Sequence, residues 1–488
     1  MLRRFLLCLL TAGLVAGGSG NQAFQDGDVV GFWGDSITHA EYSEINYTHV
    51  LYNYYVTHFP EKEIELRNLG VGGARISHGL DLYEKDPAAR GLTKVVLEYG
   101  INDLKKYLYE EPEFYEGGEE AREENLEDFR ENLNAFLETL QEDGIESNEV
   151  FATSLTVPYF LTSEGDQDQK ESQVRLQEGY ENISNISREF ARERETGFFE
   201  FREPLTELVE NSASDNQESL QNIIMQEDGV HLNTNGHIYL AYLFLEQQGA
   251  LEDVSRVEAG KNGIHSDDAE VSNFHYEDGY LYYDYQAKRL PMGVSHEYFE
   301  ADESLHILDK LNREIIQVQD LQKDAVYNIY INGEKIGSYS GAEFAEGVNI
   351  ANIRENPSQM YARAVEQMNR GRRVSELKYR KVVQNFTDCG SGETTEEELT
   401  AAFQTWQEED AEYRQSMYEL VRERIQATER VAIVREDVEA PEAAFAVPGS
   451  NHKEIVTAVF LAAGAALFVI IWFGIRRRKR NNIDKQHK

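Results

Sequence analysis

Three side chains in this sequence have the types and spacing that nucleophilic catalysis requires. Ser36 stands directly after an apolar run at residues 28–33, while Asp228 and His231 lie three residues apart much later in the chain. A serine hydroxyl attacks a carbonyl carbon when a histidine takes its proton, and a carboxylate orients that histidine and stabilises its charge. The sequence therefore offers every side chain that a nucleophilic hydrolase needs.

Short apolar runs alternate with helical patterns from residue 28 to about residue 250. The runs predict buried strands at Val29–Trp33, Ile64–Leu69, Val95–Tyr99, Val150–Leu155 and Gly197–Phe201. Helices are predicted at Asn46–Phe59, Glu123–Leu140, Gln169–Glu193 and Thr234–Gln247. This alternation predicts an α/β fold with a mostly parallel sheet, whose site forms beyond the carboxyl ends of the strands. Ser36, Gly73 and Asn102 each follow one of the first three strands, so we expect them to share a site.

Four short motifs contain these candidate residues. They are Gly34-Asp35-Ser36, Asn68-Leu69-Gly70-Val71-Gly72-Gly73, Gly100-Ile101-Asn102-Asp103 and Asp228-Gly229-Val230-His231. Each motif alone has a structural explanation, because a serine caps helices and a glycine cluster makes tight turns. Their occurrence together, in this order and at strand ends, favours catalysis.

The four motifs resemble those of the SGNH hydrolases, also called the GDSL esterase superfamily, over residues 28 to about 245. One difference is Ile37, which stands where family members commonly have leucine. The resemblance implies a flavodoxin-like three-layer α/β/α sandwich with Ser36 as the nucleophile. It also implies that the Gly73 backbone and the Asn102 side chain supply hydrogen-bond donors.

The chemistry of acyl transfer assigns a role to each residue. His231 is the base suited to near-neutral pH, and Asp228 is close enough in sequence to hold its ring. The backbone amides of Ser36 and Gly73 and the side-chain amide of Asn102 form the expected oxyanion hole.

We expect neither a cofactor nor a metal ion. The glycine cluster at residues 70–73 lacks the lysine and the spacing of a nucleotide-binding loop. His39, His78 and His237 lack the spacing of metal ligands, so we assign them to the pocket rim or the core.

The charge of the chain excludes one class of partner. Asp and Glu number 88 against 47 Lys and Arg, which gives a net charge of −41. Such a charge repels phosphate backbones, so we expect no nucleic-acid binding. The acids are scattered along predicted helices, which is typical of a solvated acidic surface.

Both ends of the chain carry apolar segments. Residues 1–20 have the basic start, apolar centre and small-residue end of a secretory signal peptide. Ile455–Ile475 contains no charged residue and is long enough to cross a bilayer as a helix, and the basic tail 476–488 follows it. We therefore expect a single-pass membrane protein with its catalytic domain outside the cytoplasm. Val447–Asn451 loosely resembles a sortase recognition site, so cell-wall attachment stays open as an alternative.

We assign residues 26–250 to the catalytic domain, and the sequence after it divides into further parts. Residues 265–355 predict a β-rich module with a hairpin turned by Asn332-Gly333. Residues 357–434 are charged with helical periodicity and predict a helical hairpin or stalk, and 435–454 resemble a linker.

These observations together predict an exported, membrane-anchored serine esterase that works through an acyl-enzyme. The family resemblance implies small acyl esters as substrates, above all O-acetyl groups on extracellular carbohydrate. Two alternatives stay open. One is an O-acyltransferase with the same triad, and the other is a surface glycan-binding protein in which residues 255–434 bind and the hydrolase fold is a passenger. The oligomeric state is not predicted.

Overall fold

The computed structural model describes residues 21–41, 43, 45–160, 167–210, 223–387 and 392–448. The expected signal peptide 1–20, the expected span Ile455–Ile475 and the tail 476–488 lie outside the described residues. Within the described ranges, no helix is both long enough and apolar enough to cross a membrane.

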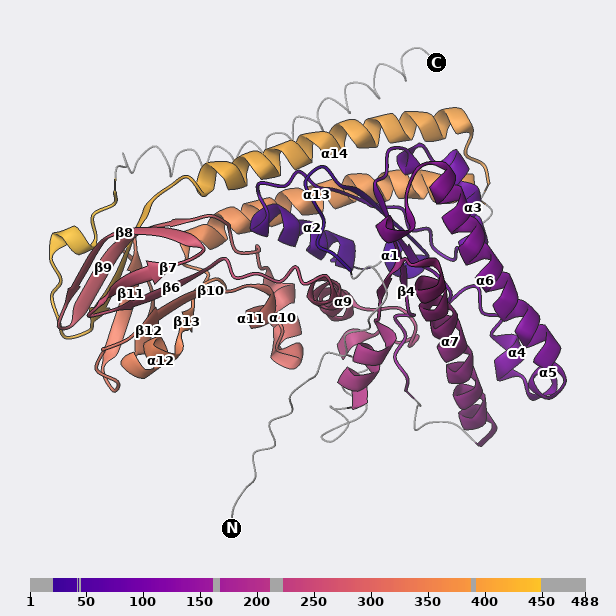
Figure 1. Cartoon of the computed structure of the whole chain (residues 1–488), viewed down its shortest axis with the longest axis horizontal. Coiled ribbons are helices and arrows are strands. Elements are labelled where there is room, and N and C mark those ends of the chain that lie inside the picture. The colour runs from indigo at the N-terminus through magenta and orange to yellow at the C-terminus, as the bar shows by residue number, and fades with distance from the viewer. Residues whose placement is uncertain are drawn as a thin grey trace, which may run out of the picture.

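An α/β part, a β-rich part and two long helices make up the described chain (Figure 1). The two helices, α13 (Pro357–Phe386) and α14 (Glu396–Arg424), lie side by side and run from the β-rich part across to the α/β part. The chain thus leaves the α/β part, builds the β-rich part and then returns to the first part through α13.

The α/β part contains a five-stranded parallel sheet in the order β2-β1-β3-β4-β5. Its strands are β1 (Val29–Gly34), β2 (Glu65–Asn68), β3 (Lys94–Glu98), β4 (Val150–Thr153) and β5 (Gly197–Phe199). This is the flavodoxin-like order, so the expected α/β class with a parallel sheet is confirmed. The order reverses at β1, whose neighbours are β2 and β3, and this is where such folds bind ligands.

Helices cover both faces of this sheet. They are α1 (Ser36–His39), α2 (Tyr47–His58), α3 (Ile76–Lys85), α4 (Tyr107–Glu110), α5 (Pro112–Gly117), α6 (Glu119–Glu142), α7 (Gln167–Arg194) and α9 (Thr234–Gln247). Successive side chains of a strand point to opposite faces. Accordingly, Phe32 packs among the side chains of α2 and α9, whereas Trp33 packs against Phe136 of α6 on the other face. Burial on both faces explains why the strands are continuous apolar runs.

The β-rich part consists of two sheets. Their strand orders are β13-β10-β6-β7 and β12-β11-β14-β9-β8. The strands are β6 (Ser255–Gly260), β7 (Gly263–Ser266), β8 (Ala269–Glu277), β9 (Tyr280–Ala287), β10 (Glu314–Val318), β11 (Val326–Ile331), β12 (Glu334–Ser340), β13 (Val348–Asn349) and β14 (Glu429–Arg435). Two short helices, α10 (His296–Leu305) and α11 (Leu308–Leu311), lie between β9 and β10 in the sequence, and α12 (Gly341–Glu346) lies between β12 and β13. Asn332 and Gly333 both have positive φ and join β11 to β12, which confirms the predicted hairpin.

The helical prediction for the end of segment 357–434 is wrong. Helix α14 ends at Arg424, and Glu429–Arg435 forms strand β14 between β11 and β9. Its apolar run at residues 431–434 is buried throughout. A central strand satisfies its backbone through two neighbouring strands, so sheet pairing determines the structure of this segment more than its local pattern does.

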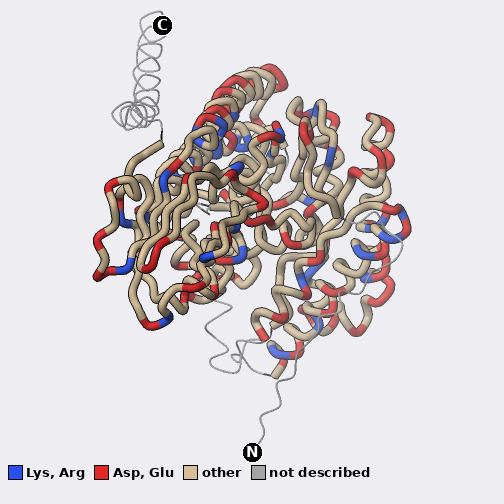
Figure 2. Tube along the Cα trace, turned by 60° about the vertical axis from the view of Figure 1, so that its left-hand side comes forward, with Lys and Arg blue, Asp and Glu red and all other residues tan. Residues whose placement is uncertain are grey.

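Acidic side chains are distributed over the whole described chain. Figure 2 shows Asp and Glu on the α/β part, on the β-rich part and along the long helices. This distribution agrees with a solvated acidic surface and not with one acidic patch.

Candidate active site

Ser36 is presented by the turn that follows the central strand. Strand β1 ends at Gly34, and the Asp35 side chain accepts the Ile37 N–H at 2.9 Å and so caps the short helix α1. A Cβ at Gly34 would lie 2.3 Å from Thr38 Oγ1, so only glycine fits there. Ser36 is the one residue of this buried turn that is partly exposed, which leaves its hydroxyl accessible to a substrate.

His231 and Asp228 lie close to this serine in space, although they come about 190 residues later in the sequence. His231 Nε2 lies 2.8 Å from Ser36 Oγ, and His231 Nδ1 lies 2.6 Å from Asp228 Oδ2. The loop that holds the pair is fixed at its end by Asn233, whose side chain accepts the Gly236 N–H at the start of α9. The structure therefore brings together all three residues that the sequence singled out as a triad.

The carboxylate of Asp228 is kept ionised by its neighbours. Burial raises the pKa of Asp228, but hydrogen bonds from His231 and Val230 outweigh burial and hold this pKa below its usual value. An ionised carboxylate beside Nδ1 fixes the tautomer in which Nε2 is free to accept a proton.

The two other motifs lie at the same edge of the sheet. The loops after β2 and β3 flank the loop after β1, because these strands are neighbours and parallel. Asn102 Nδ2 donates to the Ala74 carbonyl oxygen at 3.1 Å, which ties the third motif to the glycine loop. Gly73 has a φ of 76°, which favours glycine, and its Cα faces open space. Gly73 and Asn102 thus belong to loops that are tied together at the edge of the sheet that carries Ser36.

Three buried carboxyl groups underlie this edge. Burial raises the pKa of Asp35 to about 7 and that of Asp103 to about 7, and it raises the pKa of Glu98 well above its usual value. Thr38 Oγ1 donates to Glu98 Oε2 at 3.0 Å, and the Ile76 N–H donates to Asp103 at 3.1 Å. These carboxyls organise the backbone around the site, and none of them contacts the Ser36 hydroxyl among the described hydrogen bonds.

The other histidines that the sequence singled out have structural surroundings. His39 and His237 are buried, and burial followed by the charge of arginines on α13 lowers the pKa of each to about 3. His78 Nδ1 accepts the Arg75 N–H at the start of α3. Of the two places expected for these histidines, the pocket rim and the core, the structure has His39 and His237 in the core.

Sequence reasoning missed a contribution from α13. Arg373 Nη2 donates to the Ala40 carbonyl oxygen at 2.7 Å, just after α1, and Arg380 donates to the carbonyl oxygens of Leu69 and Gly70. In the sequence, these two arginines are about two helical turns apart, so they lie on one face of the predicted helix. Their burial could not be predicted from this spacing, because the helix is highly charged and arginine is normally exposed.

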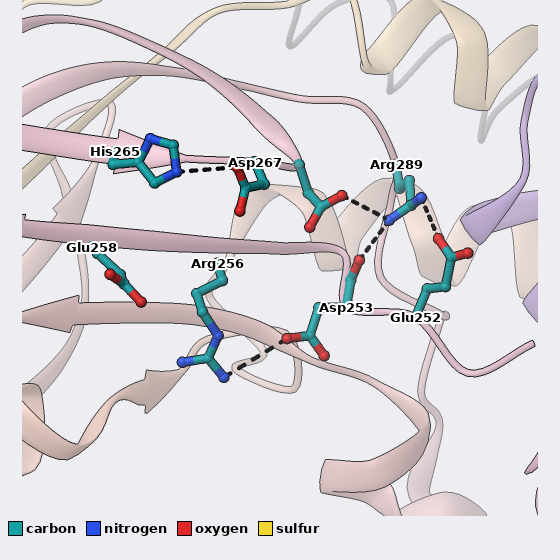
Figure 3. Close-up of a pocket in the computed structure, with 8 residues that line it drawn as sticks. Glu252, Asp253, Arg256, Glu258, His265, Asp267 and Arg289 are labelled. Atoms are coloured by element: carbon teal, nitrogen blue, oxygen red, sulfur yellow. Dashed lines mark hydrogen bonds and ion pairs between the residues drawn. The ribbon is translucent and has the colours of Figure 1, made fainter. Parts of the chain in front are cut away.

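A cavity of about 420 Å³ lies in the β-rich part, away from these residues (Figure 3). Its lining consists of Glu252, Asp253, Arg256, Glu258, His265, Asp267, Asp268 and Arg289. Arg289 points at Glu252 and Arg256 points at Asp253 (Figure 3). Arg289 also pairs with Asp268, so the two arginines of the lining pair with three of its five carboxylates. No serine or cysteine nucleophile lines the cavity, and the candidate active site is therefore the edge that carries Ser36.

No set of three His, Cys, Asp or Glu side chains within the described part of the chain is arranged to hold a metal ion.

Residues 32–238 match the GDSL-like Lipase/Acylhydrolase family. This part of the chain belongs to that family. The matched residues contain all four motifs, and this part of the chain is a carboxylic ester hydrolase domain of the GDSL type. No curated protein sequence gives a significant match to the chain.

Several solved structures are similar to parts of this chain. BT4096, a gut microbial diltiazem-metabolizing enzyme, is 20% identical with a TM-score of 0.68, and the match covers 86% of this chain and 100% of that protein. The acetyl xylan esterase AlAXEase is 23% identical with a TM-score of 0.34, over 45% of this chain and 98% of its own. Axe2, an acetylxylan esterase from Geobacillus stearothermophilus, is 18% identical with a TM-score of 0.34, over 46% and 95%. The first match extends well beyond the GDSL domain, so the fold of the additional parts occurs in another protein.

Proposed function

We propose that this GDSL-type hydrolase is a serine esterase in which Ser36, His231 and Asp228 form the catalytic triad. The observation that carries the proposal is the unbroken series of contacts from Ser36 Oγ to His231 Nε2 at 2.8 Å and from His231 Nδ1 to Asp228 Oδ2 at 2.6 Å. These are the distances at which a base takes a proton from a nucleophile and a carboxylate orients the base.

The geometry supports a two-step reaction. Ser36 Oγ attacks the carbonyl carbon of the ester, and its proton passes to His231 Nε2 while Asp228 stabilises the imidazolium. The oxygen of the tetrahedral intermediate accepts hydrogen bonds from the Gly73 and Ser36 backbone amides and from the Asn102 side chain. His231 then gives its proton to the leaving alcohol oxygen, and an acyl-enzyme remains on Ser36.

Water completes the reaction through the same groups. His231 Nε2 takes a proton from a water molecule, and the hydroxide oxygen attacks the acyl carbon of the acyl-enzyme. The bond to Ser36 Oγ breaks, His231 returns the proton to this oxygen, and the carboxylic acid leaves. No cofactor is needed for these proton transfers, because His231 takes and gives each proton: the Ser36 proton leaves with the alcohol, and a proton from water replaces it on Ser36 Oγ.

We propose small acyl groups, above all O-acetyl groups on neutral carbohydrate, as the substrate class. Two observations support this. The side chains of His231 and Asp228 are 36% and 48% exposed, so a bulky alcohol such as a sugar chain has access to the base. The net charge of −41 disfavours strongly anionic polymers.

We further propose that the chain is exported through the signal peptide at residues 1–20 and held in the membrane by Ile455–Ile475. The catalytic domain would then face extracellular or periplasmic polysaccharide. The apolar span and the basic tail that follows it support this orientation.

Acetate release tests the proposal directly. Residues 21–448 are incubated with p-nitrophenyl acetate and with acetylated xylan, and acetate is measured over time with Ser36→Ala as the matched control. Release by the wild-type protein and not by the control supports the esterase. Transfer of acetyl to an added sugar in place of acetate release would indicate an acyltransferase, and glycan binding without turnover would indicate a binding protein.

A further inference from the structure

We propose that helix α13 is a positioning element of the active site, in which Arg373 holds the nucleophile turn and Arg380 holds the glycine loop. The inference rests on the proposed role of Ser36 as the nucleophile. It assigns the C-terminal helical pair a part in catalysis, in addition to its part in the fold.

Arg373 stabilises the backbone immediately after Ser36. The one-turn helix that carries Ser36 ends at Ala40, which has a φ of 43° and a ψ of 50°, and the Ala40 N–H closes on the Ser36 carbonyl oxygen at 2.8 Å. A left-handed conformation is unfavourable for alanine and persists only where its surroundings impose it. Arg373 Nη2 donates to the carbonyl oxygens of Ala40 at 2.7 Å and of Ser43 at 3.1 Å. This guanidinium therefore helps to impose the conformation of the turn.

Arg380 holds the loop that carries Gly73. Its Nη2 donates to the Leu69 carbonyl oxygen at 2.8 Å, and its Nε donates to that of Gly70 at 3.3 Å. Its Nη1 forms an ion pair with the fully buried Asp86 at 2.6 Å. A planar guanidinium held at three nitrogens is rigid, so it fixes the two carbonyls that precede the oxyanion donor.

The two arginines belong to one buried stripe of α13. Asn369 donates to the His49 carbonyl oxygen at 2.9 Å, and Glu376 Oε1 accepts the Asn68 N–H at 3.2 Å. Together with Arg373 and Arg380 these residues recur at helical spacing, and all four are buried. The face of α13 toward the α/β part is therefore a row of polar groups that bind backbone atoms of helix α2, of the nucleophile turn and of the glycine loop.

The relative position of the two loops matters for the reaction. The loops touch, because a Cβ at Gly70 would lie 2.4 Å from the His39 nitrogen. Attack by Ser36 and stabilisation by Gly73 require both loops to be in place, and a displacement of about 1 Å costs roughly 10²-fold in rate. Since Arg373 and Arg380 hold one loop each and belong to one helix, α13 fixes the distance between the nucleophile and the oxyanion donor.

Three conservative variants of the full chain test this inference. Arg373→Lys and Arg380→Lys keep the charge but lose the fork of donors. Arg424→Lys is the matched control, because Arg424 is a buried arginine of the neighbouring helix α14 whose guanidinium contacts Ser358 and Glu429. We expect kcat for p-nitrophenyl acetate to fall about 10- to 100-fold in the first two, with KM nearly unchanged. We expect the control to lose thermal stability and to keep its kcat within about twofold.

A second measurement tests the inference if the lysine variants fold poorly. Arg373→Ala is assayed with and without free guanidinium, and recovery of part of the lost kcat would support the positioning role. Equal kcat values in Arg373→Lys, Arg380→Lys and the control, corrected for the folded fraction, would overturn the inference. Failure of the proposed function is a different result, because activity in Ser36→Ala would show it without any arginine variant.

Discussion

Asp228 holds His231 through both oxygen atoms of its carboxylate. Oδ2 lies 2.6 Å from Nδ1 of the ring, and Oδ1 accepts the backbone N–H of the same histidine at 2.9 Å. The spacing of three residues makes this double contact possible within one turn. Side chain and backbone of the base are therefore fixed by one carboxylate, which sets the direction of Nε2 toward Ser36.

Asp228→Asn is expected to lower kcat by about 10³ to 10⁴ and to leave KM less affected. An asparagine in this place can donate an N–H to Nδ1, which favours the tautomer whose Nε2 already carries its proton. Steady-state kinetics with p-nitrophenyl acetate check the effect. The double variant with His231→Ala should be no slower than His231→Ala alone, because the pair acts as one unit. Additive losses would contradict this relationship.

Ser36→Ala is expected to abolish ester hydrolysis, with a loss on the order of 10⁶ in turnover. Stability should change little, because Asp35 and not Ser36 caps helix α1. Acetate release and a thermal melt measure the two quantities separately. Activity within about tenfold of wild type would exclude Ser36 as the nucleophile.

Asn102→Ala is expected to lower kcat by about 10² to 10³ with little effect on KM, because its amide acts on charge that develops in the transition state. One N–H of this amide is used on the Ala74 carbonyl oxygen and orients the group, which leaves the second N–H for the oxyanion. Asn102→Asp keeps the shape but removes the donor, so it should be at least as slow. An effect confined to KM would argue against the oxyanion role.

The sequence predicted the parts of the molecule that depend on local pattern. The central strand, the motifs at strand ends and helix Thr234–Gln247 could all be predicted, because strands and helices differ in the spacing of their apolar residues. The position of α13 against the active site could not be predicted. Arg373 and Arg380 look like surface residues until the carbonyl oxygens that they bind are known, and those lie more than three hundred residues earlier in the chain. Strand β14 was missed for the same reason, since its partners β9 and β11 are distant in sequence.

The membrane proposal predicts different behaviour for the full chain and for residues 21–448. The full chain should sediment with membranes and require detergent, because transfer of the uncharged span at Ile455–Ile475 into a bilayer is favourable. Residues 21–448 should be recovered in the soluble fraction with unchanged kcat. Fractionation with an esterase assay checks both forms. Release only by wall-digesting enzymes would instead indicate cell-wall attachment.

Asp35→Asn is expected to stabilise the protein at alkaline pH and not at acid pH. Burial raises the pKa of Asp35 from 3.8 to about 7 in the folded chain, so the folded state binds its proton more tightly than the unfolded state. Stability from this group is therefore fully present below about pH 4, is lost as pH rises to about 7, and stays lost above that. Asparagine keeps the hydrogen bond from the Ile37 N–H but never ionises. The gain in free energy of unfolding should be on the order of 2 to 4 kcal/mol at pH 8 and should vanish near pH 4, as measured by urea titration at both pH values. An equal effect at both pH values would show that the Asp35 carboxyl does not change protonation between them.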